Sequence, residues 1–200
     1  MAYRFEAGSP DLFAIQCEIP LEQDFSGSWP LFAQITGHMC FWGGGIPIGD
    51  FSIEYYIHVS CFELEDNIRS KERIFDSQFC AMSAEEINEY YALNFYGKDP
   101  NYESSLDPKL KWRIWQQDWT GNFGPPLDGN FLRFFECKES DRFVWYNISA
   151  ETSHETVLPR GYLFDVAREY ISWFDSVVSG FDIPSRPRPS HLPGSNYSTS

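Results

Sequence analysis

The sequence has almost no positive charge in its first third. Residues 1–68 contain ten aspartates and glutamates but a single cation, Arg4. The whole chain has 15 lysines and arginines against 29 acidic residues, which gives a formal net charge of −14. A surface of this sign repels nucleic acids and anionic lipids. We therefore expect neither a nucleic-acid nor a membrane partner, and the acidity is explained either by a basic protein partner or by plain solubility.

Long apolar runs and export signals are also missing. A membrane span would need about 18 consecutive apolar residues, and the sequence has no such run. A signal peptide would need an apolar core near the N-terminus, and the first residues, Met-Ala-Tyr-Arg-Phe-Glu, contain none. The five cysteines include no Cys-x-x-Cys pair, which argues against a disulfide framework and a zinc ribbon. We predict a cytoplasmic protein whose cysteines are reduced and mostly buried thiols, at positions Cys17, Cys40, Cys61, Cys80 and Cys137.

Motifs of common catalytic sites are absent as well. The chain contains no Gly-x-Ser-x-Gly, no His-Glu-x-x-His, no P-loop and no dinucleotide fingerprint. Acid pairs such as Glu85 and Glu86 are typical of solvated surfaces. The glycines at 43–45 lead into Ile-Pro-Ile and not into a helix, so they predict a turn and not a phosphate-binding loop.

Two histidines offer the remaining chemistry. His38 and Cys40 could meet His58 or Cys61 across a hairpin as metal ligands, and His58 beside Glu54 could act as a general base. Ordinary packing and hydrogen bonding explain these residues equally well and need no coincidence of register. We predict that the protein has no catalytic residues, no cofactor and no metal.

The stretch from Met39 to Cys61 is the centre of the expected fold. It is predicted to form a hairpin whose second strand alternates apolar and polar residues, because side chains in a strand point to opposite faces in turn. The expected core face is Phe51, Ile53, Tyr55, Ile57, Val59 and Cys61, and the expected solvent face is Ser52, Glu54, Tyr56, His58 and Ser60.

Patterns elsewhere predict further strands and helices. Residues 110–119 fit both a strand (alternation at Leu110, Trp112 and Ile114) and a helix (spacing of Trp112, Trp115 and Trp119), and we favour the strand. The expected strands are residues 12–19, 31–42, 131–137 and 142–148; the expected helices are 84–95, after a Ser83 capping box, and 162–178; residues 63–76 are a surface connection or short helix, and His154 lies in a loop.

These elements predict an α+β protein. The expected architecture is a mainly antiparallel sheet built from two hairpins, with one or two covering helices. Residues 1–183 are expected to form a single domain. Residues 184–200 are rich in proline and serine and have little to bury, so we predict a flexible tail.

The order of several motifs is similar to that of a known family. These are Pro-Asp-Leu-Phe-Ala-Ile at 10–15, Cys-Phe-Trp-Gly-Gly-Gly-Ile-Pro-Ile-Gly-Asp at 40–50, Leu-Asp-Gly-Asn-Phe-Leu-Arg-Phe-Phe at 127–135 and Asp-Arg-Phe-Val-Trp at 141–145, followed by a closing helix. Over residues 8–60 and 124–178 the chain resembles the immunity proteins of bacterial polymorphic toxin systems of the type called immunity protein 42. Residues 61–123 do not align.

The resemblance implies a cytoplasmic protein that binds and blocks one cognate toxin, as in contact-dependent growth inhibition, and it carries no catalytic residues over. A basic nuclease would suit the acidic surface. We expect the toxin to bind the solvent face of the predicted strand and the acidic turn after it, unless a helix covers that face. The alternatives are a structural interaction module, and an enzyme or ligand-binding protein with an aromatic pocket around Trp112, Trp115 and Trp119 and a polar group such as His58. The predicted partner-binding residues are Glu54, Tyr56, His58, Glu63, Glu65 and Asp66.

Overall fold

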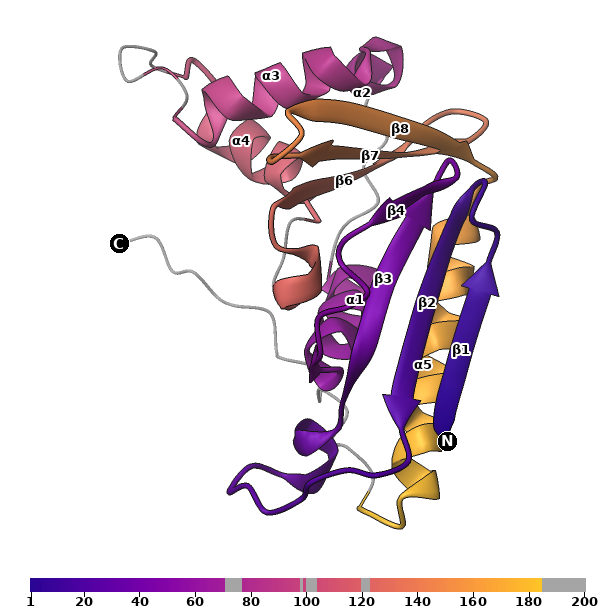
Figure 1. The fold of residues 1–200 in the computed structure, drawn as a ribbon. Helices are drawn as coiled ribbons and strands as arrows, with labels where there is room; N and C mark the ends of the chain where they lie inside the picture. Colours follow the sequence, from indigo (N-terminus) through magenta and orange to yellow (C-terminus); the bar gives the residue numbers. More distant parts are fainter. Residues whose placement is uncertain (71–76, 98, 100–103, 120–122, 185–200) are drawn as a thin grey trace.

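The computed structural model describes residues 1–70, 77–97, 99, 104–119 and 123–184. Two antiparallel sheets and the helices packed on them make up this part of the chain, which confirms the predicted α+β class (Figure 1). There are more helices than the one or two that we predicted. From residue 185 onward the predicted tail lies outside the described residues.

The first sheet is built from the N-terminal quarter of the chain. Its order is β1-β2-β3-β4, and β5 pairs with the beginning of β3. The turn between β3 and β4 passes through Gly44 and Gly45, whose φ angles of 55° and 80° favour glycine. The predicted hairpin at these glycines is therefore confirmed. The strands are β1 (Ala2–Gly8), β2 (Phe13–Pro20), β3 (Thr36–Gly43), β4 (Ile46–Ile48) and β5 (Tyr55–Tyr56).

The second sheet is a three-stranded meander of β6 (Asn130–Glu136), β7 (Asp141–Asn147) and β8 (Thr152–Leu158). The hairpin of β6 and β7 confirms the prediction. The predicted loop at His154 is wrong, because this residue lies in β8 and its ring stacks on Trp145, its cross-strand neighbour, at 5.3 Å. Such pairing stabilises a strand that has few apolar residues of its own.

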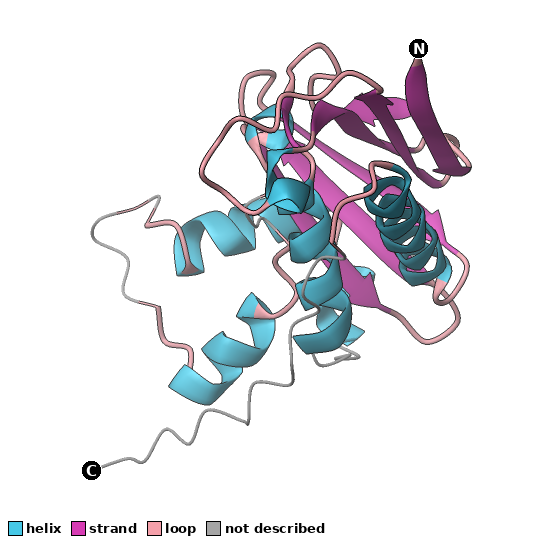
Figure 2. Ribbon diagram, turned by 90° about the horizontal axis from the view of Figure 1, so that it is seen from below, coloured by secondary structure: helices cyan, strands magenta, loops and turns pink. Residues whose placement is uncertain are grey.

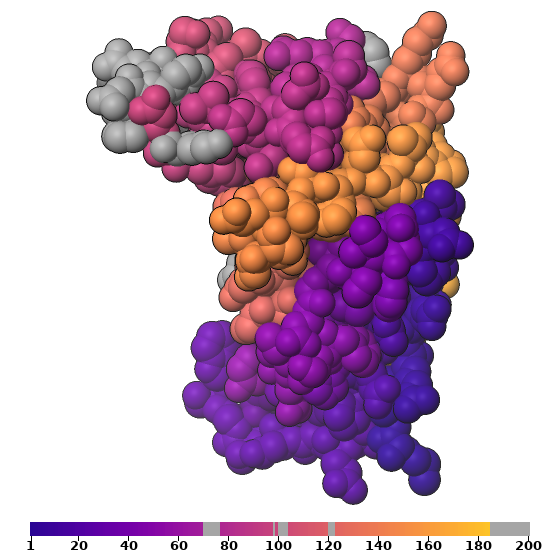
Figure 3. Space-filling view, turned by 45° about the horizontal axis from the view of Figure 1, so that its top comes forward, coloured from indigo at the N-terminus to yellow at the C-terminus, as the bar shows by residue number. Residues whose placement is uncertain are grey.

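Helices cover one face of each sheet. Helices α1 and α5 pack against each other, and α5 packs on β1 and β2, while α2 and α3 contact the second sheet on the side away from the first (Figure 1). In Figure 3 the surface of β8 lies between the surface of α2 and α3 and the surface of the N-terminal strands. The helices are α1 (His58–Ser70), α2 (Ser77–Ala81), α3 (Ala84–Asn94), α4 (Pro108–Trp115) and α5 (Tyr162–Gly180), with short 3-10 turns η1 (Leu31–Gln34) and η2 (Pro125–Leu127).

The predicted strand at residues 51–61 is wrong for most of its length. Only Tyr55 and Tyr56 are extended, and α1 begins at His58. Ile57, Cys61 and Leu64 are fully buried at a spacing of three to four residues, which is the helical period. Over so few residues the helical spacing cannot be distinguished from the alternation of a strand, which is why the sequence was misread. The helix is favoured because it covers the buried face of the first sheet together with α5.

The predicted strand at residues 110–119 is wrong too, because Pro108–Trp115 form α4. The backbone N–H of Lys109 donates to the side chain of Asp107, and Pro108 stands in the first turn, where its missing N–H costs nothing. The helix after Ser83 is confirmed together with its capping box, in which Ser83 and Glu86 each bond the other's backbone N–H.

The core has two parts because the second sheet is buried on both faces. Along β6, Leu132 and Phe134 pack toward the first sheet and α5, while Phe135 packs against the smaller cluster under α2 and α3. Arg133 is fully buried on the same side as Phe135, and its guanidinium lies 4.3 Å from the ring centroid of Tyr91. A charge in such a place is partly stabilised by the ring face.

The cysteine prediction is correct for three residues and wrong for two. Cys17, Cys40 and Cys61 are buried and do not form a disulfide, as expected. Cys80 at α2 and Cys137 after β6 form a disulfide. The two cysteines are 57 residues apart in sequence, and only the packing of α2 against β6 brings them together. Spacing alone therefore could not reveal the pair.

Candidate interaction surface

Three of the predicted binding residues, Glu54, Tyr56 and His58, remain neighbours, although they lie at the junction of a strand and a helix and not along one long strand. Glu54 accepts a hydrogen bond of 2.7 Å from the hydroxyl of Thr36, which is the cross-strand partner of Tyr56. The rings of Tyr56 and His58 are 6.2 Å apart. Tyr56 is 54% exposed, so it is available to a partner.

Two phenylalanines complete an aromatic cluster around His58. The imidazole ring is 6.1 Å from Phe32 in η1 and 5.7 Å from Phe62 one turn further along α1. Phe32 and Phe62 are 5.9 Å apart. These edge-to-face arrangements are the ones aromatic quadrupoles favour. The cluster joins η1 to the first turns of α1, which no local sequence pattern predicted.

The loop before η1 presents a further aromatic residue, Trp29, which is 68% exposed. Buried Gln34 holds this loop, because its side-chain amide accepts from the N–H of Gly27 at 2.9 Å and donates to the carbonyl oxygens of Gly27 and Trp29. A tryptophan on a loop fixed in this way can bind a partner without a large loss of conformational entropy. In the sequence, Trp29 directly follows the loop-forming residues Ser-Gly-Ser at 26–28, and this placement of a large aromatic residue in a loop is the feature that could have indicated its exposure.

Acidic residues border the aromatic ones. His58, Phe62 and Asp66 are four residues apart and so share one face of α1, and Asp66 is exposed. Glu63 is half-buried. We call the following set the aromatic–acidic surface: Trp29, Phe32, Glu54, Tyr56, His58, Phe62, Glu63 and Asp66.

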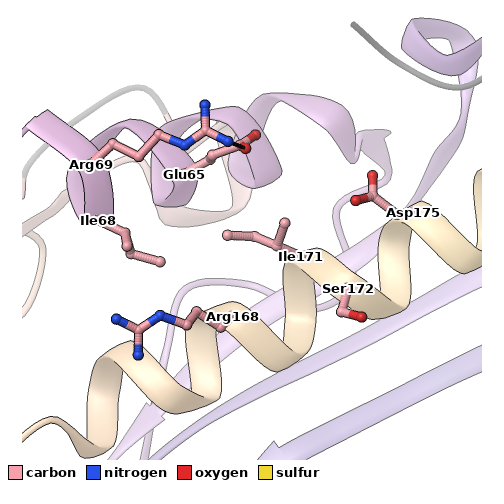
Figure 4. A pocket seen from close by; sticks show the side chains of 7 residues that line it. All are labelled: Glu65, Ile68, Arg69, Arg168, Ile171, Ser172 and Asp175. Carbon is pink, nitrogen blue, oxygen red and sulfur yellow. Dashed lines mark hydrogen bonds and ion pairs between the residues drawn. The ribbon is translucent and has the colours of Figure 1, made fainter. Parts of the chain in front are cut away.

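Glu65, which we predicted to project with the other acids, is buried on another side of α1. It is only 5% exposed and forms an ion pair with Arg69, one turn along α1. Both residues line a groove of about 380 Å³ between α1 and α5, where Ile68 and Ile171 point toward each other (Figure 4). The helix turns Glu65 toward α5, whereas an extended chain would have placed it beside Glu63.

Burial tunes two side chains at the junction. Desolvation lowers the pKa of His58, so its imidazole is neutral at pH 7 and behaves as part of the aromatic cluster. Burial raises the pKa of Tyr55, whose hydroxyl donates to Ser60 at 2.9 Å. Ser60 in turn lies 3.1 Å from the hydroxyl of Tyr170 in α5. This buried network fixes the start of α1 against β5 and α5.

The predicted tryptophan pocket is only partly present. Trp112 and Trp115 line a cavity of about 450 Å³ with Phe95, Leu106 and Lys111. Trp119 is instead buried in the main core, 5.8 Å from Phe164, and His58 belongs to the surface at the start of α1.

Neither a metal-binding cluster nor a membrane-spanning helix is found among the described residues. Among them, no three histidines, cysteines or acidic residues are grouped so that they could hold a metal ion. Within the same part of the chain, none of the helices has both the length and the apolar character to cross a membrane. At the start of α1 the exposed ring of Tyr56 lies beside the half-buried ring of His58, and Glu54 on the same short segment is exposed.

Comparison with known proteins gives the family. A family model described as immunity protein 42 matches residues 1–173. The chain belongs to this family. The match includes residues 61–123, which the sequence resemblance had left unaligned. Family membership supports a role as an immunity protein.

One solved structure has a similar fold. The crystal structure of CdiI from Burkholderia dolosa AUO158 aligns with a TM-score of 0.58 and 19% identity, over 84% of this chain and 99% of that one. At this identity the likeness concerns the fold. No curated protein sequence matches the chain.

Proposed function

We propose that this protein neutralises a cognate toxin domain by binding it through the aromatic–acidic surface. The observation that carries the proposal is the exposure of two aromatic residues, Trp29 on the loop before η1 and Tyr56 at the junction of β5 and α1, with the exposed acids Glu54 and Asp66 on the same segment as Tyr56, in a member of an immunity protein family. Tryptophan and tyrosine are the residues most enriched at binding hot spots. Inhibition by occlusion needs no chemistry of its own, so the protein would not be an enzyme.

The toxin that fits this surface is basic. A net charge of −14, concentrated in the first third of the chain, would steer a cationic domain toward it and speed the encounter. A nuclease with a basic cleft has this character, and the setting would be the cytoplasm of a cell protected in contact-dependent growth inhibition. Nucleic acid and membrane surfaces would be repelled.

The test pairs two charge variants. Glu54→Lys with Asp66→Lys should stay folded, bind the toxin on the order of tenfold more slowly, show a weaker salt dependence of the association rate, and fail to rescue cells that express the toxin. Glu85→Lys with Glu139→Lys changes the net charge equally at exposed sites around the second sheet, so it should rescue. Rescue by both folded variants would place the binding site elsewhere.

A second pair of variants tests the aromatic contribution. Trp29 and Trp112 are 68% and 66% exposed, so each can be replaced by alanine at a similar cost to the fold. Trp29→Ala should weaken toxin binding by about thirtyfold, as expected for a hot spot of about 2 kcal/mol, while Trp112→Ala should bind normally. The reverse result would move the site to α4.

The cavity beside Trp112 and Trp115 supports a second candidate function, the binding of a small apolar ligand. A ligand found there would raise the melting temperature, and Trp112→Ala would abolish that shift. Toxin neutralisation would be unaffected by the same substitution.

A further inference from the structure

The strand β1 forms an open edge of the first sheet. It pairs with β2 on one side, and no described element lies beyond it on the other. Figure 1 and Figure 2 both place this strand at the rim of the molecule, next to the N-terminus. The pairing with β2 runs without a bulge from Ala2 to Gly8, so the edge is regular over seven residues.

Hydrogen bonds at the two ends of β1 show which backbone groups are left over. Leu21 donates to the carbonyl of Met1, and Ser9 donates to the carbonyl of Phe13. In an antiparallel pair the bonded residues alternate, so the odd-numbered residues of β1 bond to β2. The N–H and C=O groups of Ala2, Arg4 and Glu6 therefore point outward, and no described residue bonds to them.

An edge of this kind is a template for another strand unless something blocks it. The outer edge of β6 is blocked, since Trp119 donates to the carbonyl of Leu132 and Phe134 donates to that of Gln117. The strand β1 has no proline, lysine or bulge that would prevent pairing. The open edge at β8 contains one acid, Glu155, and no lysine or arginine to complement it in a second copy.

We propose that two copies of the chain pair antiparallel through β1 and form one continuous sheet. The outward N–H and C=O groups of one copy must bond to the outward groups of the other copy. The twofold axis can therefore cross β1 at few positions. An axis at Phe5, the midpoint of the strand, places Arg4 opposite Glu6 of the second copy, twice. A register shifted one step either way would place Arg4 opposite Arg4, or Glu6 opposite Glu6. Only the central register joins opposite charges and pairs the whole strand.

The helix-facing side of β1 also fits this arrangement. Phe5 is buried against α5, with its ring 5.0 Å from that of Trp173, which remains half-buried. In the central register the two Phe5 residues form a pair without mutual hydrogen bonds, the closer of the two antiparallel spacings. The second copy would then cover Trp173 with its own β1 and α5, which adds apolar burial to the backbone hydrogen bonds.

Charge swaps at the axis test the proposal, with untagged protein in sedimentation velocity across a wide range of concentration. The native chain should form a concentration-dependent dimer. Arg4→Glu and Glu6→Arg each create two like-charge contacts across the axis, so each should weaken the dimer by on the order of tenfold. Arg4 also forms an ion pair with Glu18 of its own chain at 3.0 Å, so Arg4→Glu should lower the melting temperature as well. The double variant restores opposite charges across the axis and should recover the dimer. Glu85→Arg changes the net charge as much as Glu6→Arg does, at an exposed site on α3, and should dimerise normally.

Circular dichroism and a melting curve confirm that each variant is folded. A native chain that stays monomeric at every concentration would overturn the proposal, and so would a dimer that none of the swaps weakens. Glu6→Pro removes an outward N–H without touching the bonds to β2, so it gives a second disruption. If the native chain is monomeric and Glu6→Pro abolishes toxin binding, the edge receives a strand of the toxin, and pairing between copies is refuted.

Discussion

Reducing the disulfide between Cys80 and Cys137 should destabilise the fold by a large and calculable amount. The bridge spans 57 residues, a segment that includes α3, α4 and β6. Opening it releases loop-closure entropy in the unfolded chain, and the chain-entropy relation gives about 4 kcal/mol for a loop of this length. Reduction adds only two hydrogen atoms, so packing losses in the folded state are small.

Urea unfolding followed by tryptophan fluorescence measures the effect. For a chain of this size the expected loss corresponds to a fall in the midpoint on the order of 1 to 2 M urea. A Cys80→Ala with Cys137→Ala variant is the control, because its midpoint should not respond to reductant. Intact-mass measurement after alkylation under denaturing conditions should find three reactive thiols before reduction and five after it.

Two results would refute this reasoning. Five alkylated thiols without reductant would mean that the bridge is not formed. An unchanged urea midpoint in protein whose bridge has been opened would mean that the unfolded chain gains no freedom, or that the folded bridge carries compensating strain. Toxin neutralisation should survive reduction below the unfolding range, because both cysteines lie outside the aromatic–acidic surface.

Two further predictions concern the first sheet and α1. Gly37→Ala should destabilise the protein by about 1 to 3 kcal/mol, because its Cβ would overlap the carbonyl oxygen of Glu18 and press on Ile19 and Ile57, and thermal melting checks this. Burial lowers the pKa of His58, so as the pH falls through about 6.5 the unfolded chain takes up a proton first and stability declines until the folded-state pKa is reached. His58→Asn should therefore lose less stability than the native chain between neutral and mildly acidic pH, and equal losses would contradict this.

The elements that were predicted correctly from the sequence are those whose residue patterns lie within a short stretch of the chain. The apolar stripe of α5 repeats over 19 residues, and the Ser83 capping box marks the start of α3 within four positions. The hairpins at Gly44 and between β6 and β7 combine turn residues with alternating strands. Each of these patterns has one structural interpretation that its neighbours in the chain already support.

The parts that failed depend on packing at a distance. Around Ile57 the buried positions fit both a helix and a strand over a few residues. The helix forms because its first turn packs against β5 and α5, where Ser60 bonds to Tyr55 and Tyr170. The strands β1 and β8 have polar outer faces, and cross-strand partners stabilise them. In the candidate surface, Tyr56 and His58 were predicted together for the wrong geometric reason. Trp29 and Phe32 were missed because Gln34 and the pairing of β3 with β5 bring them there.

The sheet order separates the two proposed interfaces. Tyr56 lies on β5, which pairs with β3, whereas the open edge belongs to β1 on the far side of β2. Three strand spacings, about 14 Å, therefore lie between the proposed dimer edge and the proposed toxin surface. A pair of copies joined at β1 would leave both aromatic–acidic surfaces free. Each copy could then bind one toxin domain. Because the dimer edge and the toxin surface do not overlap, the dimer would have two toxin sites, each with the same contacts as in a single copy.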